Sequence, residues 1–315
     1  MGDSMVMPVY EVISGLRLAN FYPPYAVKSG LEYQPKESDV FLVTYPQCGT
    51  LWMQQVLYLL YHNGSSPKDA IALFQSNPLL ELEGSETIEA MLHPGTITSH
   101  LSYDYIPKSS EAKYVVLVRD PRDVCATMFR RLQSFPAYAF SNGILSDFVD
   151  QFCKDDVDYQ GYFSHVRSWY DHKNDSNVFW VTYEEMAKNF TEVVTRLAKF
   201  LGEDKRIIKN KGLVKKVQEK STVSYMKSKT NKYMEEFFYI PFEKLAGDMR
   251  LSEGVKSFHA SVQCSGFLEA MNSVRCVTQG KAGVWKSILS QEDAKKITDR
   301  TELLGPEVVN AICNS

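Results

Sequence analysis

A short apolar strand, followed by a loop of small residues and a long apolar helix, constrains the fold of this chain most. Residues 40–45 (Val-Phe-Leu-Val-Thr-Tyr) are rich in β-branched and aromatic residues, which is typical of a buried strand. Residues 46–50 interrupt it, and residues 51–61 predict a mostly buried helix that stops at Asn63 and Gly64. Such a loop presents free N–H groups and the positive end of the helix dipole. The pattern predicts either a phosphate-type anion site or an ordinary strand-to-helix turn, and the nucleotide motif G-x-x-x-x-G-K-[ST] is missing.

The same strand-then-helix order recurs twice. Residues 114–118 form an apolar strand that ends at Arg119, before a helix over 124–132. Residues 178–182 predict another buried strand, and a long amphipathic helix follows over 183–201. Alternation of strands and helices predicts an α/β fold with a central parallel sheet and helices on both faces. Arg119 would then lie at the carboxyl edge of the sheet, where ligands bind in such folds.

Composition restricts the class of protein. A chain of 315 residues can form one large α/β domain or two smaller ones, and we predict a single domain over 1–315. The net charge of −3 gives no basic field, so no nucleic-acid partner is expected. No stretch reaches the roughly 18 apolar residues of a membrane span, and the first ten residues lack a signal-peptide pattern. The six scattered cysteines predict reduced thiols and a cytoplasmic location, and the histidine spacing predicts no metal site.

Residues 44–52 (Thr-Tyr-Pro-Gln-Cys-Gly-Thr-Leu-Trp) resemble the T-Y-P-K-[SA]-G-T-T-W loop of the cytosolic sulfotransferases. In that family this P-loop-like segment holds the 5′-phosphosulfate of 3′-phosphoadenosine 5′-phosphosulfate (PAPS). Six of the nine positions match; Gln47, Cys48 and Leu51 replace the lysine, the small residue and the second threonine. The resemblance implies that the donor is bound by Gln47, Cys48, Gly49, Thr50, Leu51 and Trp52.

A second stretch carries the expected base. Residues 96–101 alternate like a strand and contain His100, a position at which a histidine is more often structural than catalytic. The stretch resembles the family's K-[TS]-H-L segment, whose histidine is the catalytic base. His100 falls on that histidine, and Thr98 replaces the lysine.

Other segments resemble the family's nucleotide contacts. Residues 119–127 resemble R-[ND]-P-[KR]-D-x-x-x-S, which implies that Arg119 and Thr127 bind the 3′-phosphate; alternatively, Arg119 only pairs with Asp123. Residues 183–186 resemble Y-E-[DE]-[ML], and residues 221–227 resemble [TS]-S-F-x-x-M-K. The residues implied to lie near the adenine are therefore Tyr183, Ser221 and Met226.

Residues 278–286 have the frame of the family's R-K-G-x-x-G-D-W-K, which implies a cofactor contact at Gly280. Thr278 and Gln279 replace the arginine and lysine that hold the 3′-phosphate, and Lys281 is a candidate partial substitute. No K-x-x-x-T-V-x-x-x-E dimer motif follows, so dimerisation by that route is not expected.

Two segments are expected to border the acceptor. Residues 1–38 are expected to form an irregular N-terminal arm that either contributes to the acceptor pocket, as the resemblance implies, or only packs on the surface. Residues 228–275 lack clear periodicity and predict a lid. A set of aromatic residues suits a small phenol, catecholamine or aryl alcohol as acceptor, although these residues could equally belong to the core: Phe21, Tyr22, Phe74, Phe135, Tyr138, Phe140, Phe237, Phe238 and Tyr239.

The predicted function is transfer of a sulfonyl group from PAPS to a hydroxyl or amine of a small aromatic acceptor, with His100 as base. Gln47 occupies the position of the catalytic lysine and offers only a neutral amide. Loss of one transition-state donor typically costs on the order of 10²–10³ in rate, so we expect a slower enzyme. Arg122 and Lys281 are candidate replacement cations. The alternative is a nucleotide-binding protein whose catalysis is impaired or lost.

Overall fold

The computed structural model describes residues 6–91, 93–263 and 280–313. Its central sheet has four parallel strands in the order β4-β3-β5-β6. The strands are β3 (Val40–Thr44), β4 (Ile97–Ser99), β5 (Lys113–Val118) and β6 (Val178–Thr182). After β3 the chain first adds β4 on one side and then β5 on the other, so the loops after β3 and β5 diverge. Ligands bind at such a switch point in open α/β sheets.

Two short antiparallel strands precede the sheet, β1 (Glu11–Ile13) and β2 (Leu16–Leu18). The helices in the described part of the chain are α1 (Pro24–Leu31), α2 (Thr50–Tyr61), α3 (Ala70–Ser76), α4 (Leu80–Glu89), α5 (Pro121–Ser134), α6 (Leu145–Cys153), α7 (Tyr162–Tyr170), α8 (Tyr183–Lys188), α9 (Phe190–Leu201), α10 (Asp204–Lys209), α11 (Leu213–Lys220), α12 (Val223–Ser228), α13 (Thr230–Phe238), α14 (Phe242–Leu245), α15 (Glu253–Gln263), α17 (Gln291–Glu302) and α18 (Pro306–Cys313). Short 3-10 turns occur at η1 (Pro136–Tyr138), η2 (Asp158–Gln160) and η3 (Val284–Ser287). None of the helices described is long and apolar enough to cross a membrane.

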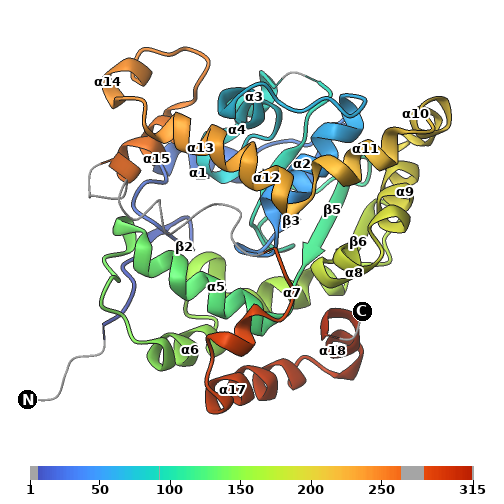
Figure 1. The fold of residues 1–315 in the computed structure, drawn as a ribbon. Helices are drawn as coiled ribbons and strands as arrows, with labels where there is room; N and C mark the ends of the chain where they lie inside the picture. Colours follow the sequence, from blue (N-terminus) through green and yellow to red (C-terminus); the bar gives the residue numbers. More distant parts are fainter. Residues whose placement is uncertain (1–5, 92, 264–279, 314–315) are drawn as a thin grey trace, which may run out of the picture.

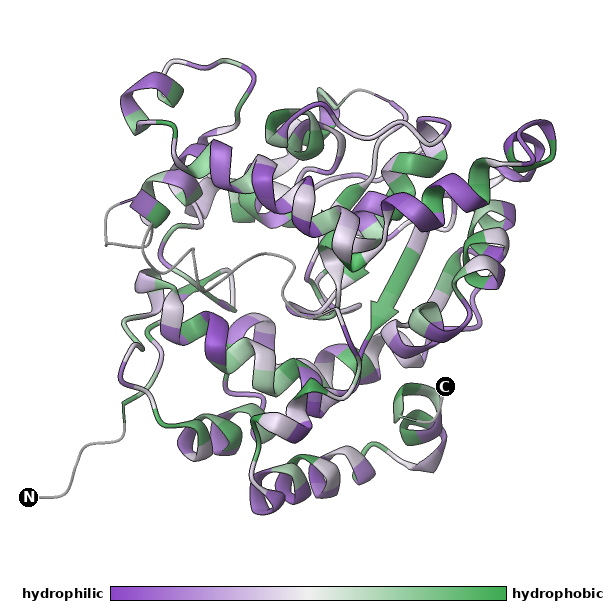
Figure 2. Cartoon of the chain, viewed as in Figure 1, coloured by the Kyte–Doolittle hydropathy of each residue, from purple (hydrophilic) through white to green (hydrophobic). Residues whose placement is uncertain are grey.

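The two faces of the sheet bury different sets of side chains. Phe41 and Val43 of β3, with Val116 of β5, pack into a core that includes α5, α6, α7 and α17. Leu42 and Val115 point the other way, into a smaller core with α2, α9 and α11. Both sets alternate because side chains along a strand point to opposite faces. Helices therefore cover the sheet on both sides (Figure 1), and the end of β5 nearest its arrowhead is hydrophobic (Figure 2), which confirms the predicted fold class.

The N-terminal arm is more regular than expected. Its β1–β2 hairpin buries Leu16 and Leu18, and α1 then packs along α4. Gly30 of α1 allows this close packing, because a β-carbon there would lie 2.6 Å from the carbonyl oxygen of Leu80. The expectation of an irregular segment was wrong, since short elements of three residues leave little periodic signal in a sequence.

Two other segments also differ from expectation. The predicted helix over 183–201 is divided into α8 and α9 at Asn189, whose φ of −123° and ψ of 39° are not helical. The expected lid is helical where it is described, as α13, α14 and α15, and residues 264–275 lie outside the described residues. The prediction of a segment without periodic structure was therefore wrong at these three helices, while the role of the segment as a lid stays a prediction.

The loop after β3 depends on Gly49. This residue caps α2 with a φ of 102°, in the left-handed region that side chains disfavour. A β-carbon on Gly49 would also lie 2.8 Å from Cδ2 of Tyr183, the first residue of α8. Glycine thus allows both the turn into α2 and the contact between the ends of β3 and β6.

Gly49→Ala is expected to lower the free energy of unfolding by about 1–3 kcal/mol, because it adds left-handed strain and a clash with the Tyr183 ring. Urea denaturation followed by circular dichroism measures the change. Gly247→Ala is the matched control, since no atom lies within 4 Å of a β-carbon there, and it should change stability by less than about 1 kcal/mol. Equal stability of Gly49→Ala and the wild type would contradict the role assigned to Gly49.

Candidate active site

A cavity of about 710 Å³ opens at the carboxyl edge of the sheet. It brings together nearly all the residues that the sequence selected, from segments far apart in the chain. The predicted site residues that line it are Gln47, Gly49, Thr50, Leu51, Trp52, His100, Arg119, Thr127, Tyr183, Ser221, Met226 and Gly280. Cys48 does not line it: its side chain is buried in the core and its N–H donates to the carbonyl of Tyr45 at 3.2 Å. Burial also raises the pKa of the Cys48 thiol, so it is not a nucleophile.

The loop between β3 and α2 presents backbone donors to this cavity. The N–H groups of Trp52 and Met53 donate to the carbonyl of Gly49. Those of Gly49, Thr50 and Leu51 have no acceptor among the described residues. Three free donors and the positive end of the α2 dipole favour an anion at this point.

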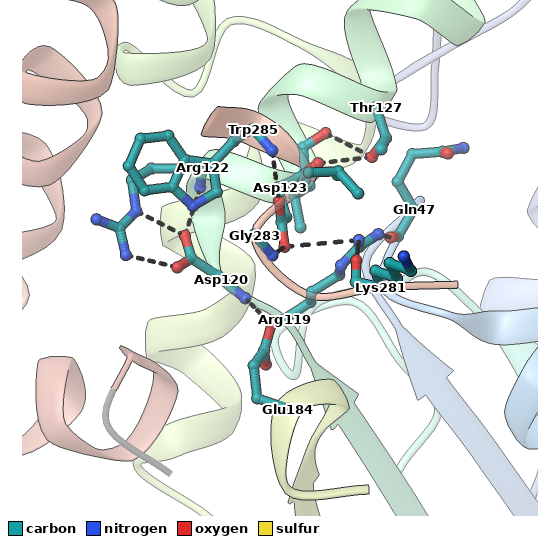
Figure 3. A network of polar contacts seen from close by, with 12 residues as sticks. Gln47, Arg119, Asp120, Arg122, Asp123, Thr127, Glu184, Lys281, Gly283 and Trp285 are labelled. Atoms are coloured by element: carbon teal, nitrogen blue, oxygen red, sulfur yellow. Dashed lines mark hydrogen bonds and ion pairs between the residues drawn. The ribbon is translucent and has the colours of Figure 1, made fainter. Parts of the chain in front are cut away.

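Arg119 fixes the position of the loop (Figure 3). Its guanidinium donates to the carbonyl of Gln47 at 3.0 Å and to that of Lys281 at 3.2 Å, and stacks over the ring of Tyr183 at 4.5 Å. Asp123 lies 3.6 Å from the same group. Arg119 is only 7% exposed, and its Nε has no partner among the described residues. Of five guanidinium N–H groups, two bind carbonyls, so donors remain for an anion.

Asp123 connects this network to the segment that starts at Gly280. The buried carboxylate accepts the N–H of Gly283 at 2.7 Å and that of Trp285 at 2.9 Å. Burial raises the pKa of Asp123, while the charge of Arg119 and these hydrogen bonds oppose the rise. Arg119 therefore does pair with Asp123, and Arg119 still lines the cavity. The two interpretations considered from the sequence are both compatible with this geometry.

The two candidate replacements for the loop lysine lie in different environments. Arg122 makes two hydrogen bonds to Asp120, at 2.9 and 2.6 Å, stacks over Trp285, and does not line the cavity. Lys281 is exposed, and its carbonyl and that of Gln47 accept hydrogen bonds from the same guanidinium. In Figure 3 Lys281 lies beside Gln47, whereas Arg122 lies across the network with Trp285. Lys281 is therefore the better placed of the two.

The remaining predicted nucleotide residues surround the same end of the cavity. The hydroxyl of Thr127 donates to the carbonyls of Asp123 and Val124, at 2.7 and 3.2 Å, within α5. Ser221 is 4% exposed, and its Oγ has no partner among the described residues. The buried indole Nε1 of Trp52 is also unpaired there, between the rings of Tyr183 and Phe190. Buried donors without partners are costly, so both atoms are suited to hydrogen-bond a molecule in the cavity.

His100 stands at the end of β4 with a defined orientation. Its Nδ1 lies 2.7 Å from the carbonyl oxygen of Thr44, so Nδ1 carries the proton and donates it there. Nε2 is then the unprotonated nitrogen, and His100 lines the cavity. The backbone N–H of His100 donates to the buried carboxylate of Glu81 at 2.6 Å. Burial lowers the pKa of His100 to about 4, so the imidazole is neutral at physiological pH.

This geometry agrees with comparisons with known proteins. Residues 37–240 match the sulfotransferase domain family. The chain belongs to the sulfotransferase family.

Among curated sulfotransferases, rabbit (Oryctolagus cuniculus) amine sulfotransferase is 33% identical over 55% of this chain and 59% of its own length. Human (Homo sapiens) sulfotransferase 4A1 is 31% identical over 61% of this chain and 69% of its own. The match thus spans about three fifths to two thirds of these relatives.

Solved structures share the fold over most of this sulfotransferase. Mouse sulfotransferase SULT7A1, complexed with PAP, superposes with a TM-score of 0.65 and 21% identity, over 94% of this chain and 93% of its own. Retinol dehydratase, in complex with androsterone and the inactive cofactor PAP, gives a TM-score of 0.61 and 16% identity, over 95% and 87%.

The other end of the sulfotransferase cavity contains residues that the sequence did not reveal. Tyr159 approaches His100 with its ring edge at 5.3 Å between centroids, and its hydroxyl bonds that of Tyr22 at 2.6 Å. Tyr159 has a φ of 55°, which no local pattern predicts. Other lining residues that the sequence did not reveal include Glu83, Arg130, Arg131, Asp158 and Phe258. Of the aromatic residues expected to border an acceptor, Phe21, Tyr22, Phe74, Tyr138 and Phe238 line the cavity; Phe135, Phe140 and Phe237 are in the core, and Tyr239 is 53% exposed.

Proposed function

We propose that this protein is a cytoplasmic enzyme that transfers a sulfonyl group from PAPS to a hydroxyl or amine of a small aromatic acceptor. The observation that carries the proposal is the orientation of His100. Its Nδ1–H is held by the carbonyl of Thr44, the residue directly before the anion-type loop, so Nε2 is available as a base in the same cavity. The free thiols of Cys48, Cys125, Cys153 and Cys313 support a reducing compartment.

The residues present fit the donor. The free N–H groups of residues 49–51 suit the 5′-phosphosulfate, Arg119 and Thr127 suit the 3′-phosphate, and Ser221 suits the adenine end of the nucleotide. Mouse SULT7A1 and retinol dehydratase both have PAP in their structures, which supports the same class of nucleotide here. When bound, the donor supplies the sulfonyl group and a 3′,5′-bisphosphate leaving group.

His100 performs the proton transfer. Nε2 takes the proton of the acceptor hydroxyl as the acceptor oxygen bonds to sulfur and the bond from sulfur to the phosphate oxygen breaks. The Thr44 carbonyl stabilises the imidazolium that forms, because Nδ1–H remains bonded to it. Glu81 fixes the backbone at His100. The aromatic side chains of Phe21, Phe238 and Phe258 provide apolar walls for an aryl acceptor.

Binding of 3′,5′-bisphosphoadenosine should raise the melting temperature, and Ser221→Ala should weaken binding about tenfold while leaving the ligand-free protein unchanged. The reason is that the Ser221 hydroxyl has no bond to lose within the described protein. Ser228→Ala is the control, because its exposed hydroxyl bonds the carbonyl of Tyr225 outside the cavity. Calorimetry and thermal shift measure both. No shift at millimolar nucleotide would overturn the proposed donor class.

His100→Ala should keep nucleotide binding and lose transfer by on the order of 10²–10⁴. Because burial lowers the pKa of His100 to about 4, the base stays neutral on acidification, and the wild-type rate should not fall near the usual histidine pKa of about 6.5. Rates with a radiolabelled sulfonyl donor, from pH 8 to about pH 5, test this. His172→Ala is the control: His172 lies outside the cavity, so this variant should transfer at the wild-type rate. If His100→Ala loses nucleotide binding together with transfer, His100 has a structural role and is not the base.

A second candidate function, nucleotide binding without turnover, is favoured by the neutral side chain of Gln47. The two functions predict different effects of substitutions at these positions. If the protein is an active enzyme in which Lys281 supplies the positive charge that Gln47 lacks, Lys281→Met should lower the transfer rate about 10- to 100-fold. Adding Gln47→Lys to that variant should restore part of the rate. Arg122→Met is the control, since Arg122 is committed to Asp120 and Trp285. Wild-type protein that binds nucleotide but modifies no phenol, amine or alcohol, and gains activity only with Gln47→Lys, would establish the second function.

A further inference from the structure

Helix α5 runs along the cavity and carries an arginine toward the acceptor end. Thr127 lines the cavity near the predicted 3′-phosphate site, and Arg131 follows one helical turn later. Arg131 is half-buried and also lines the cavity. Its guanidinium lies over the ring of Phe135, at 5.3 Å from the centroid. An always-charged side chain therefore faces the space beside the proposed base.

The guanidinium of Arg131 forms no ion pair or hydrogen bond within the residues described. Its positive charge nevertheless acts on the groups around it. It helps to lower the pKa of His100 and opposes the raised pKa values of Asp158, Tyr22 and Tyr138, all of which line the cavity. These four groups locate the charge of Arg131 at the acceptor end, among the side chains that would contact an acceptor.

Two carboxyl groups at this end do not cancel that charge. Asp158 already accepts the hydroxyl of Tyr138 at 2.9 Å, and Glu83 accepts the N–H of Leu79 and the hydroxyl of Ser252. Burial raises the pKa of each to about 7, so both are partly protonated at neutral pH. None of the side-chain donors of Arg131 is used in a hydrogen bond to another described residue. Among residues 6–91, 93–263 and 280–313, the acceptor end therefore offers a guanidinium that is not held in an ion pair.

We propose that the acceptor carries, besides the hydroxyl or amine that receives the sulfonyl group, a negatively charged group such as a carboxylate that Arg131 binds. This inference rests on the proposed function, which places the acceptor at this end of the cavity. A guanidinium binds a carboxylate through two parallel hydrogen bonds, and half-burial strengthens them relative to water. Arg131 is then the residue that determines the charge preference for the acceptor.

Three phenols of similar size test the proposal. They are 4-hydroxyphenylacetate, 4-ethylphenol and tyramine, whose tails are negative, neutral and positive. Their dissociation constants from the full-length wild-type protein are measured by calorimetry, which needs no turnover. We expect 4-hydroxyphenylacetate to bind about 10- to 100-fold more tightly than 4-ethylphenol, and tyramine to bind most weakly.

Arg131→Met, which keeps the aliphatic part of the side chain, should remove the preference for 4-hydroxyphenylacetate without changing the affinity for 4-ethylphenol. Arg131→Lys should retain part of the preference. Arg250→Met is the matched control, because Arg250 is 58% exposed, pairs with Asp248 and lies outside the cavity, and it should behave as the wild type. Thermal melts verify that each variant is folded.

Each result counts for or against the inference. Tightest binding of tyramine would overturn it and assign recognition to Asp158, and equal or no binding of all three phenols would also overturn it. Transfer rates with PAPS are measured in parallel. Transfer without a charge preference would overturn this inference and leave the proposed function standing. A carboxylate preference in binding, lost in Arg131→Met but without transfer, would support this inference and count against the proposed function.

Discussion

The buried pair of Arg119 and Asp123 holds the candidate site together. Arg119 binds the carbonyls of Gln47 and Lys281, and Asp123 binds the N–H groups of Gly283 and Trp285. Three segments distant in sequence therefore meet at one ion pair with almost no exposure. Removing either partner would leave a buried charge without compensation, which typically costs about 3–5 kcal/mol. The residue expected to bind an anion is thus also a structural residue, and a substitution of Arg119 would confound the two roles.

Orientation of the proposed base follows from the register of the sheet. In the parallel pair β3–β4, Val43 lies opposite Ser99, the last residue of β4, so His100 follows beside Thr44. Thr44 still pairs with Leu117 of β5, and its carbonyl accepts the His100 imidazole. Thr44 also leads directly into the loop that presents free N–H groups. The strand pairing therefore sets both the tautomer of the proposed base and its proximity to the anion-type loop. Among the described residues, a backbone carbonyl and not a carboxylate orients the His100 ring.

The sequence predicted the parts of the site that are local in the chain. The strand, the loop and α2 occupy one continuous segment, and Arg119 directly follows a strand, so periodicity and order along the chain were enough. The acceptor end could not be found in this way. Asp158 and Tyr159 reach the cavity through a turn in which Tyr159 and Gln160 have positive φ values of 55° and 65°. Only tertiary contacts, such as the bond of Tyr159 to Tyr22, sustain that conformation in residues other than glycine. Arg131 was missed for a simpler reason: an arginine in an amphipathic helix is usually solvated.

The distribution of charge along the cavity separates binding of the donor from recognition of the acceptor. At the loop, the free donors are neutral N–H groups, Gln47 adds only an amide, and the charge of Arg119 is partly balanced by Asp123. At the other end Arg131 has no counter-ion among the residues described. Neutral donors fixed by backbone geometry act over short distances and depend on close fit, whereas a cation acts over several ångströms and discriminates by charge. Under the proposed function, we expect such a site to select the donor mainly by the shape of its anion and the acceptor mainly by the sign of its charge.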